Sequence, residues 1–194
     1  MNLCLCSSCT KDIEPVLYSI TVVIKDQMTY RCTALFRYEK TLKKIIGLFK
    51  FSRELKQAKA CAGLILENLN LAFNPDIIVP VPSHPIEEIK RGFSHMNYLA
   101  GIISQRIEIP YYPVIGRKVF PLTSRSQKAK GKKQRFSDRK RFYIRKDSPD
   151  IVGKKILLID DVMTTGVTMN DCADILMEHG AAKVHGISLG LTPF

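Results

Sequence analysis

The residues best suited to chemistry in this chain follow one another directly. Four apolar residues, Ile156–Ile159, precede two adjacent aspartates, Asp160 and Asp161. Such an apolar run is typical of a buried parallel strand, and ligands of open α/β sheets bind at the carboxyl ends of these strands. Neighbouring carboxylates repel each other. A ribose diol would relieve that repulsion by donating hydrogen bonds to both, with a divalent ion as a further partner.

The residues that follow the two acids form a candidate phosphate site. Thr164, Thr165, Gly166 and Thr168 offer hydroxyl and backbone N–H groups at the expected start of a helix, where anions are favoured. A purely structural alternative is a strand, an Asx-type turn and a threonine N-cap. A single aspartate at a helix start is common, but the whole series favours a sugar-phosphate site.

Hydrophobic periodicity predicts the elements that position this site. Helical spacing predicts two helices between residues 34 and 73, separated near residues 51 and 52, and another over 93–107. Strands are predicted over 18–24, 76–82 and 111–115. Lys155–Ile159, a helix over 169–179 and the strand Val184–Leu189 form a right-handed βαβ unit. We therefore expect an α/β fold with a central, mainly parallel sheet and flanking helices.

Composition indicates a soluble globular protein. The chain has 194 residues, of which 45% are hydrophobic and 25% charged, enough for one domain and a short appendage. No apolar run approaches the roughly 18 residues that suggest a membrane span. The first ten residues lack the basic and apolar stretches of a signal peptide. We expect a cytoplasmic protein with no membrane partner.

The net charge of +12 is concentrated in one segment. Between Arg117 and Lys146 there are 13 Lys or Arg and one acid, Asp138, so this segment holds the entire imbalance. Much of it lacks periodicity, which predicts a mobile excursion over residues 117–134. Such a block must be solvated or matched by an anion, and polyphosphates and nucleic acids are the usual anions.

Three of the six cysteines, Cys4, Cys6 and Cys9, lie in the first nine residues. In a cytosolic chain this crowding favours metal or chance over disulfides. Cys6 and Cys9 have chelating spacing and Cys4 is a candidate third ligand, but four ligands are needed for a tetrahedral zinc site. We expect an N-terminal cap over residues 1–33, either a zinc site or a degenerate finger, followed by the main domain over 34–194.

The series Ile156–Thr168 (ILLIDDVMTTGVT) resembles the phosphoribosyl pyrophosphate (PRPP) motif of type I phosphoribosyltransferases throughout. The resemblance implies that fold, with Mg²⁺ accompanying PRPP. It implies that the two acids take the ribose hydroxyls and act as catalytic residues, while Thr164–Thr168 take the 5′-phosphate. The PRPP-binding residues implied here are Asp160, Asp161, Val162, Met163, Thr164, Thr165, Gly166 and Thr168.

Two upstream segments resemble the ComF family more narrowly. Val79–Pro85 (VPVPSHP) and Lys90–His95 (KRGFSH) are similar to its pyrophosphate-side loop, which typically reads Pro-Val-Pro and then Arg-Gly-Phe-Asn-Gln. The resemblance implies that Ser83 and His84 lie near pyrophosphate and that Arg91 is its cation. Taken alone, these segments also fit a rigid strand exit and a turn. A lone histidine such as His95 is more often structural or at the surface.

The ComF resemblance, which spans about residues 49–191, implies a protein that handles single-stranded DNA in natural transformation, together with DNA-import machinery proteins. The basic segment would follow the phosphate backbone, with aromatic residues as stacking faces. The residues concerned are Lys128, Lys130, Lys132, Lys133, Arg135, Arg139, Lys140 and Arg141.

Two alternatives remain open. The chain could be an active phosphoribosyltransferase that joins PRPP to a nitrogen base, with the basic segment as a closing catalytic loop. It could also be a PRPP-sensing regulator that binds RNA through the basic segment.

Overall fold

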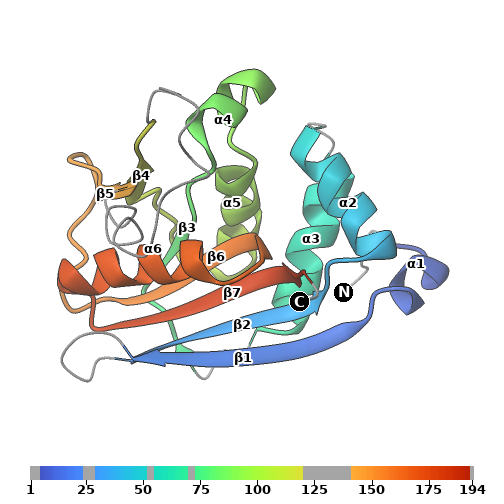
Figure 1. The fold of residues 1–194 in the computed structure, drawn as a ribbon, viewed down its shortest axis with the longest axis horizontal. Helices are drawn as coiled ribbons and strands as arrows, with labels where there is room; N and C mark the ends of the chain where they lie inside the picture. Colours follow the sequence, from blue (N-terminus) through green and yellow to red (C-terminus); the bar gives the residue numbers. More distant parts are fainter. Residues whose placement is uncertain (1–4, 24–28, 52–54, 70–72, 120–140, 193–194) are drawn as a thin grey trace, which may run out of the picture.

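The computed structural model describes residues 5–23, 29–51, 55–69, 73–119 and 141–192 (Figure 1). Its centre is a five-stranded sheet of order β1-β2-β7-β6-β3. The strands are β1 (Pro15–Val23), β2 (Thr29–Arg37), β3 (Ile77–Pro80), β6 (Lys155–Met163) and β7 (Lys183–Leu191). β1 is antiparallel to β2, and the other neighbouring pairs are parallel. The predicted α/β fold with a mainly parallel sheet is confirmed.

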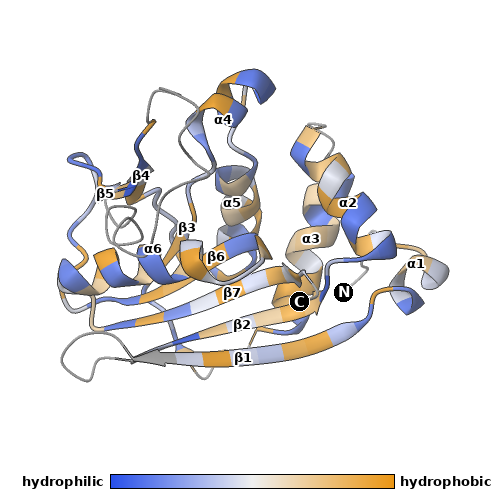
Figure 2. Cartoon of the chain, viewed as in Figure 1, coloured by the Kyte–Doolittle hydropathy of each residue, from blue (hydrophilic) through white to orange (hydrophobic). Residues whose placement is uncertain are grey.

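Helices cover both faces of this sheet. On one face α2 (Lys40–Phe51), α3 (Leu55–Glu67) and α5 (His95–Ile107) share a core with Leu157 and Ile159 of β6. On the other, α6 (Val167–Glu178) packs on Ile156 and Leu158. Figure 2 shows hydrophilic and hydrophobic stretches alternating along α2 and α6, as expected for helices with one face in a core.

A two-stranded hairpin lies beside the sheet, on the same side as α6. Its strands β4 (Ile115–Arg117) and β5 (Phe142–Ile144) pair antiparallel, and Ile115 and Phe142 are buried in the core under α6. The remaining described helices are the short α1 (Ser7–Lys11) and α4 (Pro85–Arg91). No helix in the described part of the chain is long and apolar enough to cross a membrane.

Several elements differ from those expected from the sequence. The strand predicted over 111–115 is wrong, because Tyr111 forms only an isolated bridge to Ile78 and β4 begins at Ile115. β2, β5 and α4 were not predicted. The boundary expected between residues 33 and 34 falls inside β2, so both β1 and β2 belong to the central sheet. β2 joins the sheet by pairing with β7, which is far away in the sequence, and β1 joins it by pairing with β2.

Candidate functional site

Strand β6 carries the two acids between its neighbours β3 and β7. The strand continues past them to Met163 because its pairing with β7 persists to the contact of Met163 with Leu191. Successive strand residues face opposite sides of a sheet. Asp161 therefore lies on the side of α2 and α5, and Asp160 on the side of α6 and the hairpin. The adjacent carboxylates have separate surroundings.

Asp161 is buried and held by two positively polarised groups. His95 Nε2 donates to its Oδ2 at 2.7 Å, and Lys50 Nζ lies 3.0 Å from the same oxygen. Burial raises the pKa of Asp161, but the hydrogen bond from His95 and the charge of Lys50 outweigh burial and hold that pKa below its usual value. Asp161 is therefore an ionised carboxylate fixed by α2 and α5.

His95 connects Asp161 to the loop that follows β3. It is the first residue of α5, only 3% exposed, and its ring meets that of Phe49 edge-on. Its Nδ1 lies 2.6 Å from Arg91 Nη1. A guanidinium can only donate, so Nδ1 accepts and the proton sits on Nε2. This hydrogen-bond network assigns His95 as the neutral Nε2–H tautomer.

Asp160 is half-buried and differently placed. Its Oδ1 accepts a hydrogen bond from the backbone N–H of Asp161 at 2.9 Å. Burial, followed by the negative charge of Asp161, raises the pKa of Asp160 to about 8, against smaller opposing effects of Lys50 and Arg117. A carboxyl group that gains its charge near neutral pH can donate a hydrogen bond when protonated and bind a cation when ionised.

The turn after the acids leads into α6. Gly166 is the N-cap residue with a φ of 77°, and no side chain caps this helix. The threonine N-cap of the structural alternative is therefore absent. Thr164 and Thr165 are exposed and Thr168 is half-buried. Uncapped N–H groups at a helix start can bind an anion, and the neighbouring hydroxyl groups add donors.

The pyrophosphate-side residues lie in the next loop of the same sheet edge. Ser83 Oγ is 3.3 Å from His95 Nδ1, and Arg91 also donates from Nε to the carbonyl oxygen of Glu87 at 2.9 Å. His84 is the N-cap residue of α4, without a side-chain capping bond. Thus Ser83 and Arg91 are joined to Asp161 through His95, and His84 starts the neighbouring helix.

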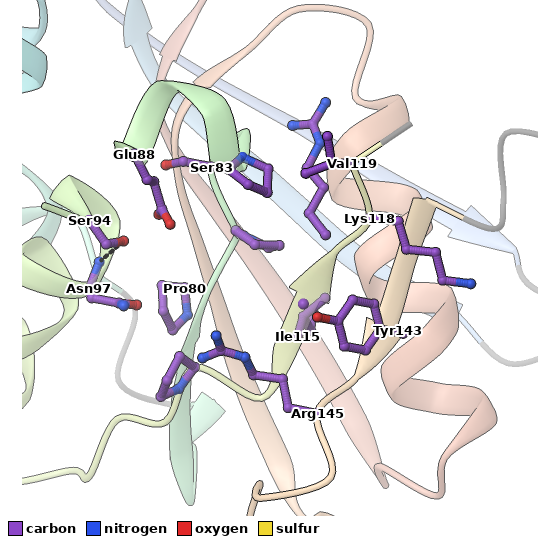
Figure 3. Close-up of a pocket in the computed structure, with 15 residues that line it drawn as sticks. Pro80, Ser83, Glu88, Ser94, Asn97, Ile115, Lys118, Val119, Tyr143 and Arg145 are labelled. Carbon is purple, nitrogen blue, oxygen red and sulfur yellow. Dashed lines mark hydrogen bonds between the residues drawn. The ribbon is translucent and has the colours of Figure 1, made fainter. Parts of the chain in front are cut away.

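A pocket of about 600 Å³ opens beside this loop, between it and the β4–β5 hairpin (Figure 3). Ser83 belongs to its lining, as do Pro80 and Pro82. Its opposite wall carries Arg117 and Lys118 of the hairpin region. The pocket thus continues the candidate site from the end of β3 toward the basic segment.

Of the other predicted site residues, only some lie in the described part of the chain. The basic residues Lys128, Lys130, Lys132, Lys133, Arg135, Arg139 and Lys140 lie outside the described residues, and so does Cys4. Arg141, which is described, is half-buried beside the start of β5.

Two N-terminal cysteines, Cys6 and Cys9, lie in the described part of the chain. Hydrogen bonding from Ser8, and then from Cys9, lowers the pKa of Cys6 to about 7, which favours the thiolate form that metals bind. Cys6 and Cys9 flank the start of α1. Within the described ranges, no cluster of three or more His, Cys, Asp or Glu residues could hold a metal. These residues do not complete a tetrahedral zinc set, and zinc stays a prediction.

The structure also adds Lys50 and His95 to the residues identified from sequence. Lys50 lies in the last turn of α2, where its spacing suggests only a solvent-facing basic residue. His95 directly follows the Arg-Gly-Phe-Ser series, which is the one local signal for it. Their contacts with Asp161 span 111 and 66 positions of the chain.

Comparison with known proteins finds similarity over most of the chain. The family model for the phosphoribosyl transferase domain matches residues 52–189. Competence protein ComFC of Streptococcus pneumoniae is 26% identical over 202 residues, covering 96% of this chain and 87% of that protein. DNA utilization protein YhgH of Escherichia coli is 27% identical over 161 residues, covering 79% and 69%.

Solved structures include adenine phosphoribosyltransferase from Saccharomyces cerevisiae, with a TM-score of 0.47 and 12% identity over 90% of this chain and 83% of that chain. The relatives named as competence proteins confirm the resemblance that the motifs indicated.

Proposed function

Because this chain belongs to the phosphoribosyl transferase domain family, we propose that the edge of its sheet binds ribose 5-phosphate or PRPP. The observation that carries this proposal is the acid pair at the end of β6, followed at once by the uncapped start of α6. A sugar phosphate has hydroxyl groups for the acids and an anion for the helix start. Both features fit one ligand.

The two acids have different roles in this proposal. Asp160 is the residue that takes a ribose hydroxyl and, once ionised, a Mg²⁺ ion that accompanies PRPP; oxygen ligands are what this ion prefers. Asp161 takes the second ribose hydroxyl in this proposal, while its contacts with Lys50 and His95 hold the end of β6 in position. Val162 and Met163 continue the strand, while Thr164, Thr165, Gly166 and Thr168 receive the 5′-phosphate.

The pyrophosphate side is assigned to Ser83, His84 and Arg91. Arg91 uses one N–H group on His95 and another on Glu87. A guanidinium has five N–H donors, so others remain for a phosphate oxygen. The link through His95 then connects the pyrophosphate side with the ribose side of the same ligand.

The experiment for this site is a thermal-shift titration with ribose 5-phosphate and with Mg-PRPP. A ligand that binds only the native state raises its melting temperature. We expect Asp160→Asn to remove that shift and leave the unliganded protein folded. Asp147→Asn is the matched control, because Asp147 is exposed and lies in the turn after β5. An unchanged shift in the Asp160 variant would remove this residue from the site.

At the level of the cell, we propose a role in DNA uptake, with handling of single-stranded DNA during natural transformation in the cytoplasm and with DNA-import proteins as partners. Relatives named as competence and DNA utilization proteins support the uptake context. The charge excess between Arg117 and Lys146 supports contact with a phosphate backbone. Binding of labelled single-stranded oligonucleotides tests this role directly.

Transfer of the phosphoribosyl group to a nitrogen base is the second candidate. Its support is a pocket large enough for a small ligand beside Ser83, which is assigned above to the pyrophosphate side. Incubation with Mg-PRPP and a pool of bases distinguishes a transferase from a protein that only binds PRPP. Base-dependent release of pyrophosphate would favour the transferase, whereas binding of PRPP without release would favour a ligand-binding role.

A further inference from the structure

The pocket between the loop after β3 and the β4–β5 hairpin has two chemically different walls (Figure 3). One wall carries Glu88 of α4, the N-cap residue Ser94 and Asn97 of α5, and the other carries Lys118, Tyr143 and Arg145 of the hairpin side. Ser83 of the proposed pyrophosphate side belongs to its lining, whereas Asp160, Asp161 and the turn 164–168 do not. We propose that this pocket binds one nucleotide, with its base against Tyr143 and its phosphate at Arg145.

Tyr143 presents an exposed aromatic ring that lies against the hairpin backbone. In the hairpin it pairs with Gly116, and a Cβ atom at Gly116 would lie 2.3 Å from Cζ of the tyrosine ring. The ring therefore lies directly over the glycine, where any larger residue would displace it. Tyr143 remains 41% exposed. An accessible aromatic ring is what base stacking requires.

The opposite wall offers hydrogen-bonding groups for the edge of a base. The Asn97 amide has both donors and an acceptor, and the Glu88 carboxylate accepts. Both residues are half-buried, and among the described residues no cationic group lies within 4 Å of the Glu88 carboxylate. Pro80, Pro82 and Pro113 line the pocket between the walls and suit the apolar face of a planar ring.

The charges set the orientation of the ligand. In Figure 3 the guanidinium of Arg145 is directed from the hairpin side toward Pro80 and Asn97, while Lys118 is directed outward. Neither cation has a carboxylate within 4 Å in the described part of the chain. Glu88 would repel a polyphosphate that filled the pocket. A base near Glu88 with a single phosphate at Arg145 matches the charges of both walls, because the base can donate hydrogen bonds to the carboxylate and the phosphate can pair with the guanidinium.

The position of the pocket connects it with the basic segment. β4 ends at Arg117 and β5 begins at Phe142, so the described residues that border the basic segment on both sides lie at this pocket. A nucleotide of a single strand bound here would have its neighbouring phosphates near the residues that border that segment. If the bound nucleotide belongs to a DNA strand, the inference rests on the DNA role proposed above. A free nucleotide presents the same base and the same phosphate to the pocket.

Fluorescence of 2-aminopurine tests the pocket, because the chain has no Trp to interfere and stacking quenches this base. The probes are 2-aminopurine deoxyribonucleoside 5′-monophosphate and a thymidine oligonucleotide with one internal 2-aminopurine. We expect quenching with at least one of them. Tyr143→Leu should weaken binding by about 5- to 100-fold, and Tyr143→Phe, which keeps the ring, should not.

Arg145→Gln supplies a second and independent measurement at an exposed position. Wild-type protein should bind the 2-aminopurine nucleotide more tightly than the corresponding nucleoside, and this preference should disappear in the variant. Binding of the monophosphate identifies a free nucleotide as a sufficient ligand, whereas binding of the oligonucleotide alone identifies a strand. No quenching with either probe, or quenching unaffected by Tyr143→Leu, would overturn the inference.

The ribose 5-phosphate thermal shift keeps this test separate from the proposed function. If the pocket is a distinct site, Asp160→Asn should abolish that shift and leave quenching intact. Competition between ribose 5-phosphate and the 2-aminopurine nucleotide would show that the two share one site and would also overturn the inference. A normal thermal shift without quenching refutes the nucleotide pocket alone.

Discussion

His95 Nε2 lies 2.7 Å from Asp161 Oδ2, so the first residue of α5 is bonded to the carboxylate near the end of β6. On its other side His95 accepts from Arg91. A neutral imidazole supplies one donor and one acceptor on opposite edges. A glutamine amide also offers both, which is consistent with the glutamine that the ComF pattern has at this position.

A first prediction concerns this bridge. His95→Leu removes the donor to the buried Asp161, and we expect it to lower the free energy of unfolding by about 1–3 kcal/mol. His95→Gln should retain most of the stability and the thermal shift with ribose 5-phosphate. Urea denaturation of the three proteins provides the measurement. If His95→Gln were as destabilised as His95→Leu, size and packing against Phe49 would be the important property of His95.

A second prediction concerns pH and Asp160. Its folded-state pKa of about 8 exceeds the about 4 of an unfolded aspartate, so the folded protein binds more protons between these values. The contribution of Asp160 to stability therefore falls as pH rises through that window. Asp160→Asn removes this dependence. Its melting temperature relative to wild type should rise from pH 5 to pH 8 within the window.

Exposed Asp147→Asn is the control for the pH series, and its difference from wild type should be nearly constant over the same range. Circular dichroism melts in Mg²⁺-free buffer give the comparison, because a bound cation would itself favour the ionised form of Asp160. A flat difference for Asp160→Asn would show that the carboxyl is already ionised at pH 5.

A third prediction compares two glycines. Gly166 has a φ of 77° at the start of α6, so Gly166→Ala should destabilise the protein by about 1 kcal/mol and weaken ribose 5-phosphate binding. Gly47 lies inside α2, and a Cβ there meets nothing within 4 Å. Gly47→Ala should stabilise by about 0.5–1 kcal/mol. Changes of the same sign would contradict the assigned backbone conformation at Gly166.

A fourth prediction concerns salt and single-stranded DNA. If the basic segment neutralises phosphates, the logarithm of affinity should fall by about 0.7 per log unit of salt for each phosphate. Replacing Lys128, Lys130, Lys132 and Lys133 with Ala should flatten that slope and weaken binding. Fluorescence anisotropy over a range of salt concentrations measures both.

Asp160→Asn is the matched variant for the DNA measurement, since it changes a carboxyl group outside the basic segment and leaves every Lys and Arg in place. Its affinity should be unchanged or slightly higher, with the same slope. Absence of binding by wild-type protein near 0.1 M salt, where the Debye length is about 10 Å, would refute the DNA-handling role.

The local hydrophobic pattern was sufficient to predict the helices and strands that bury one of their own faces. The apolar run Ile156–Ile159 predicted β6, and the repeat through Leu42, Ile45, Ile46 and Phe49 predicted α2, because burial of one face leaves a periodic signature. The Asp-Asp and Thr-Thr-Gly series likewise identified the candidate ribose and phosphate positions. These are features in which neighbours in the chain are neighbours in space.

The partners of Asp161 could be found only in the folded chain. Lys50 and His95 reach it from two helices that the sheet brings together, and neither side chain has a periodic or spacing signature of this contact. The surroundings on the two faces of β6 also give the adjacent acids different pKa values: burial raises the pKa of Asp160, whereas His95 and Lys50 outweigh burial and keep Asp161 ionised. A carboxyl pKa depends on the charges and burial around it, and tertiary packing determines both.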